Sequence, residues 1–266
     1  APAVAGHVSR KRRGVGMGAA MHVSGNRTIG NWDGSSVMLK INEDGRVVLH
    51  SGEADAGQGA MTMLAQVVAH ELDIPLAHVH VAIPDTDVSP WCIGALASRV
   101  TIAGGNAAIV AACLARDKLF ALAAEALKVP ADQLQLVSGV VSVQGDPARK
   151  FTLAELGRMH IWRHGGEGIQ VVGSWDSKTV MHDDKVYGNI APAYSFAAQA
   201  VEVEVDTETG QVKVLNSFVS DDCGRAFNPQ AVHGQSNGAA AQAIGWALYE
   251  QLQLDGGRLV NGNFAD

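Results

Sequence analysis

The chain has 266 residues, of which 47% are hydrophobic and 18% charged, and its formal net charge is −7. This composition excludes an intrinsically disordered chain, and the acidic balance argues against a nucleic-acid partner, which requires a clustered basic surface. No stretch approaches the roughly 18–20 apolar residues of a membrane span. The basic run Arg10-Lys11-Arg12-Arg13 is interpreted as a solvated or interface segment.

The cysteine and glycine content restricts the class of protein further. Cys92, Cys113 and Cys223 are widely separated, which excludes a disulfide framework or zinc ribbon and favours a reducing compartment, so we expect a cytoplasmic protein. The 30 glycines are clustered, which indicates backbone that approaches something closely. The sequence starts at Ala1 without a signal-peptide pattern, and we expect a piece of a longer polypeptide or a processed chain.

The first half predicts a hairpin, a strand and two helices. Two apolar runs flank the turn Glu43-Asp44-Gly45, which is typical of a β-hairpin. Apolar residues at helical spacing then predict an amphipathic helix after Gly59, and alternation predicts a half-buried strand. An alanine-rich run without proline predicts a long helix. The ranges are 36–42 and 46–51 for the hairpin, 61–72 for the first helix, 78–84 for the strand and 103–127 for the long helix.

The second half predicts short strands, a long hairpin and a final helix. Two strand-like runs lie in 134–143, a short helix is expected at 152–159 and a glycine-containing loop at 163–168, whereas about 145–190 reads as an irregular connection. Strands are expected at 194–206 and 211–220, and Asn228-Pro229 predicts the start of a helix that runs to about Glu250. The expected fold is α+β, with β-hairpins, mixed sheets and long helices, in two lobes at about 30–145 and 190–266.

Three segments are candidates for chemistry. The first runs from Gly52 to Gly59, where a strand passes through glycines into a helix. Free backbone N–H groups and the helix dipole favour an anion at such a junction, and Gln58 lies between two glycines. A plain strand-to-helix turn is the alternative.

The second segment surrounds Arg99. Asp85-Thr86-Asp87 ends a strand, and 94–101 precedes Gly104-Gly105-Asn106 at the start of the long helix. Arg99 offers a fork of donors, and Ser98 and Thr101 add hydroxyls, which suits a phosphate. A surface loop with a solvated arginine is the alternative, and neither a P-loop nor a dinucleotide fingerprint is present.

The third segment is the helix after Pro229. Small residues recur along one face at Gly234, Gly238, Ala241 and Gly245, although each glycine in a helix costs about 1 kcal/mol relative to alanine. Close packing against another element and close approach of a ligand both explain the stripe. Gln235, near that face, favours the ligand.

Metal-ligand and hydrolase patterns are weak. His78 and His80 lie on the polar face of the predicted strand, and His160 and His164 lie in the irregular region. Neither pair has a third ligand nearby in sequence, so we expect solvated or hydrogen-bonded histidines. No Gly-x-Ser-x-Gly motif occurs.

Taken together, the three segments resemble the molybdenum-binding large subunit of the xanthine dehydrogenase/aldehyde oxidase (molybdenum hydroxylase) family. The matching stretches are Gly57-Gln58-Gly59 with Thr62 and Gln66, Asp85-Thr86-Asp87, Ser98-Arg99-Val100-Thr101 with Gly104-Gly105-Asn106-Ala107, and 222–229 running into Gly234-Gln235. Their order and separation fit over roughly residues 12–266. The Ser-Arg-Val-Thr run looks most like the 4-hydroxybenzoyl-CoA reductase alpha-subunit branch.

The resemblance implies a molybdopterin cofactor, as its cytosine dinucleotide, lying across these loops. It implies that Gly57, Gln58 and Gly59 touch the pterin or its phosphates, that Ser98, Arg99, Val100 and Thr101 hold the dinucleotide, and that Gln235 lies on the cofactor. Molybdenum would be held by the cofactor's dithiolene, with no protein metal ligand. The implied partners are the remainder of the molybdenum subunit, a [2Fe–2S] subunit and an FAD subunit, because three scattered cysteines cannot bind two clusters.

The resemblance also implies an activity that this chain does not complete. The family's catalytic glutamate falls beyond the chain end, so no catalytic residue is assigned, and Gly238-Ala239 stands where relatives often have Gly-Gly. The expected reaction is hydroxylation of an aldehyde or heteroaromatic carbon with water or, in the closest branch, reductive dehydroxylation of an aromatic acyl-CoA. Two alternatives stay open: a non-catalytic structural or assembly module of the same fold, and a flavin- or nucleotide-binding module that uses the 57–59 junction.

Overall fold

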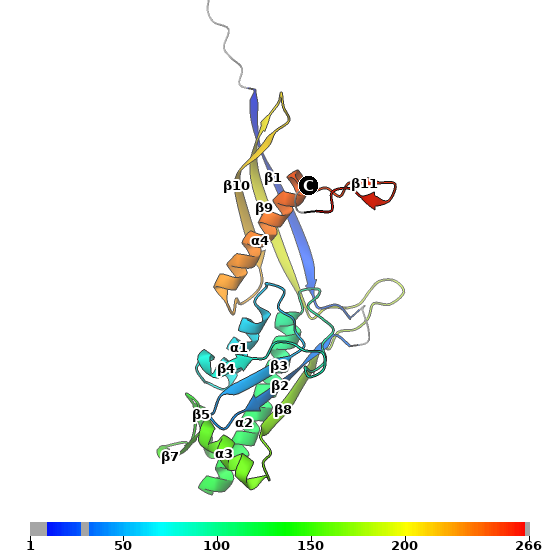
Figure 1. Cartoon of the computed structure of the whole chain (residues 1–266). Coiled ribbons are helices and arrows are strands. Elements are labelled where there is room, and N and C mark those ends of the chain that lie inside the picture. Colours follow the sequence, from blue (N-terminus) through cyan, green and yellow to red (C-terminus); the bar gives the residue numbers. More distant parts are fainter. Residues whose placement is uncertain (1–9, 28–31, 264–266) are drawn as a thin grey trace, which may run out of the picture. The chain divides into compact units, whose positions relative to one another are not determined.

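The structure is a computed structural model that describes residues 10–27 and 32–263. The chain divides into two compact units (Figure 1): unit 1 contains the described residues up to Met21 and from Ser195 onward, and unit 2 runs from His22 to Tyr194. The stretch 145–190, which we expected to be a connection between lobes, therefore lies inside unit 2.

Unit 2 is built on a four-stranded sheet in the order β4-β3-β2-β8. β2 (Gly34–Ile41) and β3 (Val47–Ser51) form the predicted antiparallel hairpin, and both strands alternate buried with less buried residues. β4 (Val79–Val81) runs parallel to β3, and β8 (Ile169–Asp176) runs antiparallel to β2. One face of this sheet carries the apolar core of the unit.

Two helices cover that face (Figure 1). α1 (Ala60–Glu71) and α2 (Gly105–Leu127) confirm the predicted helices, and a π-helical turn (Val100–Gly104) leads into α2. α2 approaches the sheet closely because it presents small side chains and β8 presents a glycine. A Cβ added at Gly173 would overlap Ala111 N and lie 2.7 Å from both Ala107 O and Ala111 Cα.

The stretch between the long helix and β8 is more regular than the sequence suggested. β5 (Leu134–Val137), β6 (Val140–Val143) and β7 (Asp146–Thr152) form a three-stranded sheet, and α3 (Leu153–Arg163) follows. Two short 3₁₀ turns, Leu76–His78 and Ala131–Gln133, precede β4 and β5. β7 escaped prediction because its polar side chains are almost all exposed, whereas the Thr152–Glu155 capping box that starts α3 is visible in the sequence.

Unit 1 contains a three-stranded sheet in the order β1-β9-β10. β9 (Ala193–Asp206) and β10 (Val212–Asp222) confirm the predicted hairpin, and α4 (Pro229–Leu248) confirms the last helix, which Asn228 caps by accepting a hydrogen bond from Ala231 N at 3.0 Å. β1 (Lys11–Ser24) was not predicted. Short strands β11 (Leu254–Asp255) and β12 (Arg258–Leu259) form a small hairpin.

The N-terminal basic run belongs to this sheet. Lys11 and Arg13 both pair with Glu204 on β9, at 2.8 and 3.2 Å, and Arg10 pairs with Asp206 at 3.0 Å. These contacts lower the pKa of Glu204, the hydrogen bond from Lys11 most of all. The run therefore lies in intramolecular ion pairs.

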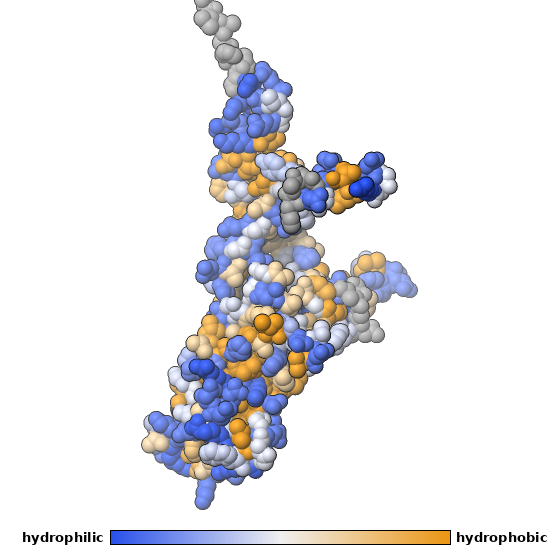
Figure 2. Space-filling model, viewed as in Figure 1, coloured by the Kyte–Doolittle hydropathy of each residue, from blue (hydrophilic) through white to orange (hydrophobic). Residues whose placement is uncertain are grey.

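Unit 1 leaves many large apolar side chains exposed, and hydrophobic patches reach the surface in Figure 2. Phe218 on β10 and Trp246 on α4 are 67% and 65% exposed, and no residue of α4 is buried. Within the described part of the chain, no helix has the length and apolar character needed to cross a membrane.

Candidate functional site

The glycine loop 52–59 connects β3 to α1. Gly57 and Gly59 adopt φ values of +104° and +84°, which non-glycine residues rarely adopt. The Asp55 carboxylate accepts hydrogen bonds from the Gly57, Gly59 and Met61 amides at 2.9, 3.2 and 3.4 Å. These bonds, the one from Gly57 above all, lower the pKa of Asp55. A carboxylate of the chain itself thus occupies three of the amides around the start of α1 that we expected to be free, those of Gly57, Gly59 and Met61.

Gln58 also bonds within this loop. Its Oε1 accepts from Ala56 N at 2.6 Å, and its Nε2 donates to Ala54 O at 2.9 Å. A Cβ added at Gly57 or Gly59 would meet no atom within 4 Å, so the space beside both glycines is open. A ligand that uses the Gln58 amide would replace these local bonds.

The second candidate loop, 94–101, presents two hydroxyls to solvent. Ser98 and Thr101 are exposed, whereas Val100 is buried. Ala97 and Ser98 are successive non-glycine residues with φ values of +46° and +50°, and Ala97 O accepts a hydrogen bond from Gly25 N at 2.7 Å. Left-handed non-glycine residues cost about 1–3 kcal/mol each and persist only where their surroundings fix them.

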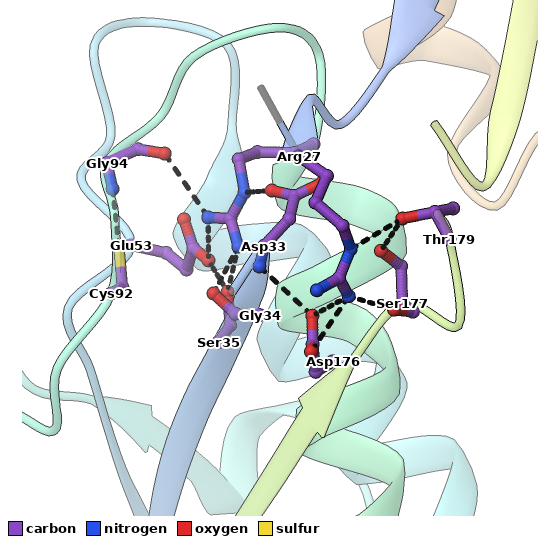
Figure 3. A network of polar contacts seen from close by, with 11 residues as sticks. Arg27, Asp33, Gly34, Ser35, Glu53, Cys92, Gly94, Asp176, Ser177 and Thr179 are labelled. Atoms are coloured by element: carbon purple, nitrogen blue, oxygen red, sulfur yellow. Dashed lines mark hydrogen bonds and ion pairs between the residues drawn. The ribbon is translucent and has the colours of Figure 1, made fainter. Parts of the chain in front are cut away.

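Arg99 points into unit 2 and away from solvent. Its side chain is 0% exposed, and all five N–H donors of a guanidinium have protein acceptors. These are the carboxylates of Asp33 (2.9 Å) and Glu53 (3.3 Å), the Ser35 hydroxyl (3.1 Å), and the carbonyls of Gly94 (3.3 Å) and Gly34. Figure 3 shows these acceptors converging on one point. The structure does not support the predicted phosphate contact of this guanidinium, because no donor is left for a ligand.

Glu53 is the partner of Arg99 at the start of the glycine loop. Its buried carboxylate accepts from Ser35 Oγ and from Arg99 through Oε1. Burial raises the pKa of Glu53, while the Ser35 hydrogen bond and the Arg99 charge act in the opposite direction. A Cβ added at Gly104 would lie 3.1 Å from Glu53 Cγ, so the glycine before α2 leaves room for this side chain.

The polar network continues to β8. Arg27 pairs with both carboxylate oxygens of Asp176 at 2.9 Å, and Asp176 also accepts from the Asp33 backbone N–H at 3.0 Å (Figure 3). Cys92 lies on the Glu53 side of the network, where its thiol donates to Gly52 O at 3.3 Å. Burial and the neighbouring Glu53 carboxylate raise the pKa of this thiol.

Gln235 lies on α4 in unit 1, whereas the other candidate residues belong to unit 2. Its side chain is exposed. A Cβ added at Gly234 or Gly238 would meet no atom within 4 Å, so packing against the sheet does not explain these small residues. The helix contacts β10, where the Ser236 hydroxyl donates to the Asp221 carboxylate.

The two histidine pairs of the sequence analysis differ in burial. His78 and His80 are exposed, as predicted. His160 is 7% exposed, and neither of its ring nitrogens has a hydrogen-bond partner, which corrects the expectation of a solvated or hydrogen-bonded side chain. Burial lowers the pKa of His160, and the stacked ring of His164, with centroids 4.2 Å apart, adds to this effect. Among residues 10–27 and 32–263, no cluster of three His, Cys, Asp or Glu side chains could hold a metal ion.

Sequence reasoning missed two carboxylates of the site. Asp55 precedes Gly57 by two residues, and an Asp two residues before a turn glycine is a local signal that could have identified it. Asp33 meets Arg99 across 66 positions of sequence, and no local pattern links them. Gln66 on α1, which belongs to the stretches that carry the resemblance, has its Oε1 buried without a hydrogen-bond partner.

The sequence matches the molybdopterin cofactor-binding domain family over residues 2–266. It is 32% identical to the 6-hydroxypseudooxynicotine dehydrogenase complex subunit gamma of Paenarthrobacter nicotinovorans, covering 96% of this chain and 31% of that one. It is also 32% identical to the putative xanthine dehydrogenase molybdenum-binding subunit of Escherichia coli, covering 96% and 33%. The quinoline 2-oxidoreductase structure from Pseudomonas putida 86 superposes with a TM-score of 0.79 at 28% identity, covering 96% and 33%. The chain thus spans about a third of these relatives' length.

Proposed function

Because this chain belongs to the molybdopterin cofactor-binding domain family, as part of a molybdenum-binding large subunit of the xanthine dehydrogenase/aldehyde oxidase family, we propose that it cradles a molybdopterin cofactor. The observation that carries the proposal is the meeting of the two candidate loops of unit 2 at the Glu53–Arg99 contact of 3.3 Å. One buried polar contact therefore holds the glycine loop and the 94–101 loop together.

The residues of the two loops suit a molybdopterin cofactor chemically. Ser98 and Thr101 offer exposed hydroxyls, Gly57 and Gly59 have open space beside them, and hydroxyls and open backbone suit a phosphate-bearing ligand. The Asp55 carboxylate already accepts from the Gly57 and Gly59 amides of the glycine loop. A second anion there would be repelled, so this loop suits the hydrogen-bonding pterin better than its phosphates.

We assign the roles accordingly. Gly57, Gln58 and Gly59 lie against the pterin, and Ser98 and Thr101 hold the dinucleotide phosphates through their hydroxyls. Val100 contributes only main chain, since its side chain is buried. Gln235 contacts the cofactor from α4. When bound, the molybdenum–dithiolene group supplies the redox chemistry, while this chain binds it, orients it and limits its contact with water.

The finer activity is also a proposal. Quinoline and xanthine, which appear in the names of two relatives, are nitrogen heteroaromatics, and these names favour hydroxylation of a heteroaromatic carbon over reduction of an acyl-CoA. We propose the cytosine dinucleotide form of the cofactor and a cytoplasmic complex with a [2Fe–2S] subunit and an FAD subunit. The relative called a dehydrogenase complex subunit supports the multi-subunit arrangement.

Hydroxyl deletion tests the assignment of the dinucleotide loop. In the complete molybdenum subunit, the Ser98→Ala/Thr101→Val double variant should weaken cofactor retention by roughly thirtyfold, since two lost hydrogen bonds contribute about 1 kcal/mol each. Molybdenum per subunit and acid-released nucleotide report the loss. Thr209→Ala, which removes an exposed hydroxyl from the β9–β10 turn, is the matched control and should retain full occupancy. Full occupancy in the double variant would contradict the assignment.

A further inference from the structure

One buried cation connects the two candidate loops of unit 2. Arg99 closes the 94–101 loop on itself by donating to Gly94 O at 3.3 Å, and it reaches the glycine loop through Glu53 at 3.3 Å. On its far side it is fixed to the start of β2 through Asp33 at 2.9 Å and the Ser35 hydroxyl at 3.1 Å. A single side chain therefore determines where three segments lie relative to one another.

The conformation beside Arg99 requires such an anchor. Ala97 and Ser98 are both left-handed, with φ values of +46° and +50°, and consecutive left-handed residues persist only where neighbouring contacts fix them. On one side the Gly25–Ala97 bond of 2.7 Å fixes the turn. On the other side the buried Arg99 fixes it, and a π-helical turn begins directly afterwards at Val100. Such turns are frequent at functional sites.

The side chains of residues 98–101 face two opposite directions. Ser98 and Thr101 are exposed, whereas Arg99 and Val100 between them are buried at 0% and 8% exposure. The inward arginine thus sets the outward direction of the two hydroxyls. Deleting it would leave Asp33 and Glu53 buried without their cation, which is strongly destabilising.

We infer that Arg99, held by Asp33 and Glu53, is a positioning residue that fixes the hydroxyls of the 94–101 loop and couples this loop to the glycine loop. It acts through the protein and touches no ligand. The inference rests on the proposed function only for the identity of what the loops hold. The coupling between the two loops does not require a bound ligand, so it can be tested in protein without cofactor.

Two roles for Arg99 make opposite predictions in the absence of ligand. A phosphate-binding arginine would leave the loops unchanged when it is replaced by lysine, and only cofactor retention would suffer. A positioning arginine would loosen both loops, because lysine has three donors for the five acceptors. Asp33 and Glu53 separate the roles further, since neither carboxylate could hold a phosphate.

The experiment is hydrogen exchange of the whole molybdenum-binding polypeptide, produced in cells that cannot make molybdopterin. We expect Arg99→Lys and Glu53→Ala to speed exchange of amides in 52–59 and 94–104 by roughly tenfold or more. Glu53→Gln keeps an acceptor oxygen and should stay within about twofold of the wild type. If Arg99→Lys does not fold, Asp33→Ala, which removes the acceptor of the 2.9 Å contact with Arg99 Nε, should speed exchange in the same two loops.

Leu156→Ala is the control for general destabilisation. Leu156 is fully buried on α3, so its truncation should speed exchange around α3 more than in either loop. Unchanged exchange of both loops in Arg99→Lys, or in Asp33→Ala as its substitute, would overturn the inference. Molybdenum analysis of the wild-type subunit from a cofactor-producing host tests the proposed function separately, because the exchange result does not depend on cofactor.

Discussion

Gly173→Ala tests how closely α2 lies against the sheet beneath the site. Gly173 pairs with Val37 across β8 and β2, and an added methyl group would overlap Ala111 N and lie 2.7 Å from Ala107 O. Normal contacts between carbon atoms are about 3.5–4.0 Å, so the helix or the strand has to shift by about 1 Å. Overpacking of this kind costs about 1–3 kcal/mol, and more when backbone atoms are involved.

This cost corresponds to a measurable change in melting temperature. For a domain the size of unit 2, 1 kcal/mol shifts Tm by roughly 2–4 °C, so a cost of about 1–3 kcal/mol should lower the Tm of Gly173→Ala by about 2–12 °C in a calorimetric or circular-dichroism melt. Gly168→Ala is the matched control, since its methyl group would meet only Lys40 Cε at 3.9 Å and should change stability by less than about 0.5 kcal/mol. Equal melting of Gly173→Ala, Gly168→Ala and wild type would refute the close packing of α2 on β8.

Three further predictions concern titrating groups. Hydrogen bonds lower the pKa of Asp55 below the usual 3.8, so this carboxylate stabilises the loop above pH 3.8, and the stabilisation is lost as pH falls through the folded-state pKa. An NMR titration of the Asp55 carboxyl should therefore show a midpoint below 3.8. A midpoint at or above 3.8 would contradict this prediction. Burial lowers the pKa of His160 below 6.5, so the folded state binds fewer protons, and the free energy of unfolding should fall as pH drops below 6.5. Urea unfolding at pH 7 and 5 should show a smaller fall for His160→Gln than for wild type, and identical falls would be inconsistent with this reasoning. Burial raises the pKa of Glu53 above 4.5, so the wild type should lose stability as pH rises from 4.5 through the folded-state pKa. Glu53→Gln should remove this pH dependence. An unchanged pH dependence in the variant would count against the raised pKa.

Much of the fold followed from local sequence patterns. The β2–β3 hairpin, α1, α2, β5 and β6, the β9–β10 hairpin and α4 all appear where periodicity, turns and caps predicted them. β1, β7 and β8 were not predicted. β1 alternates apolar residues with glycine rather than with polar residues and has no buried face, and β7 is polar and almost entirely exposed, so neither shows the apolar–polar alternation of a half-buried strand. β8 does alternate buried and exposed residues, and it was missed within the stretch interpreted as irregular.

The candidate site was also predictable only where it depends on local sequence, and not where it depends on contacts between distant residues. The glycine loop and the exposed hydroxyls of Ser98 and Thr101 could be located from the sequence because glycine conformations and hydroxyl spacing are local properties. The direction of Arg99 could not. An arginine among small residues looks solvated or ligand-facing until Asp33 and Glu53, 66 and 46 residues away, are brought beside it by the sheet.

The measurement that tests the central claim most directly is the molybdenum and nucleotide content of the complete native subunit, purified with its co-purifying partners. We predict near-stoichiometric molybdenum together with acid-released cytidine monophosphate. A folded, intact native complex with neither would contradict the account and would favour a structural or assembly module of the same fold. A yellow colour, or adenine nucleotide in place of cytidine monophosphate, would instead favour a flavin- or nucleotide-binding module.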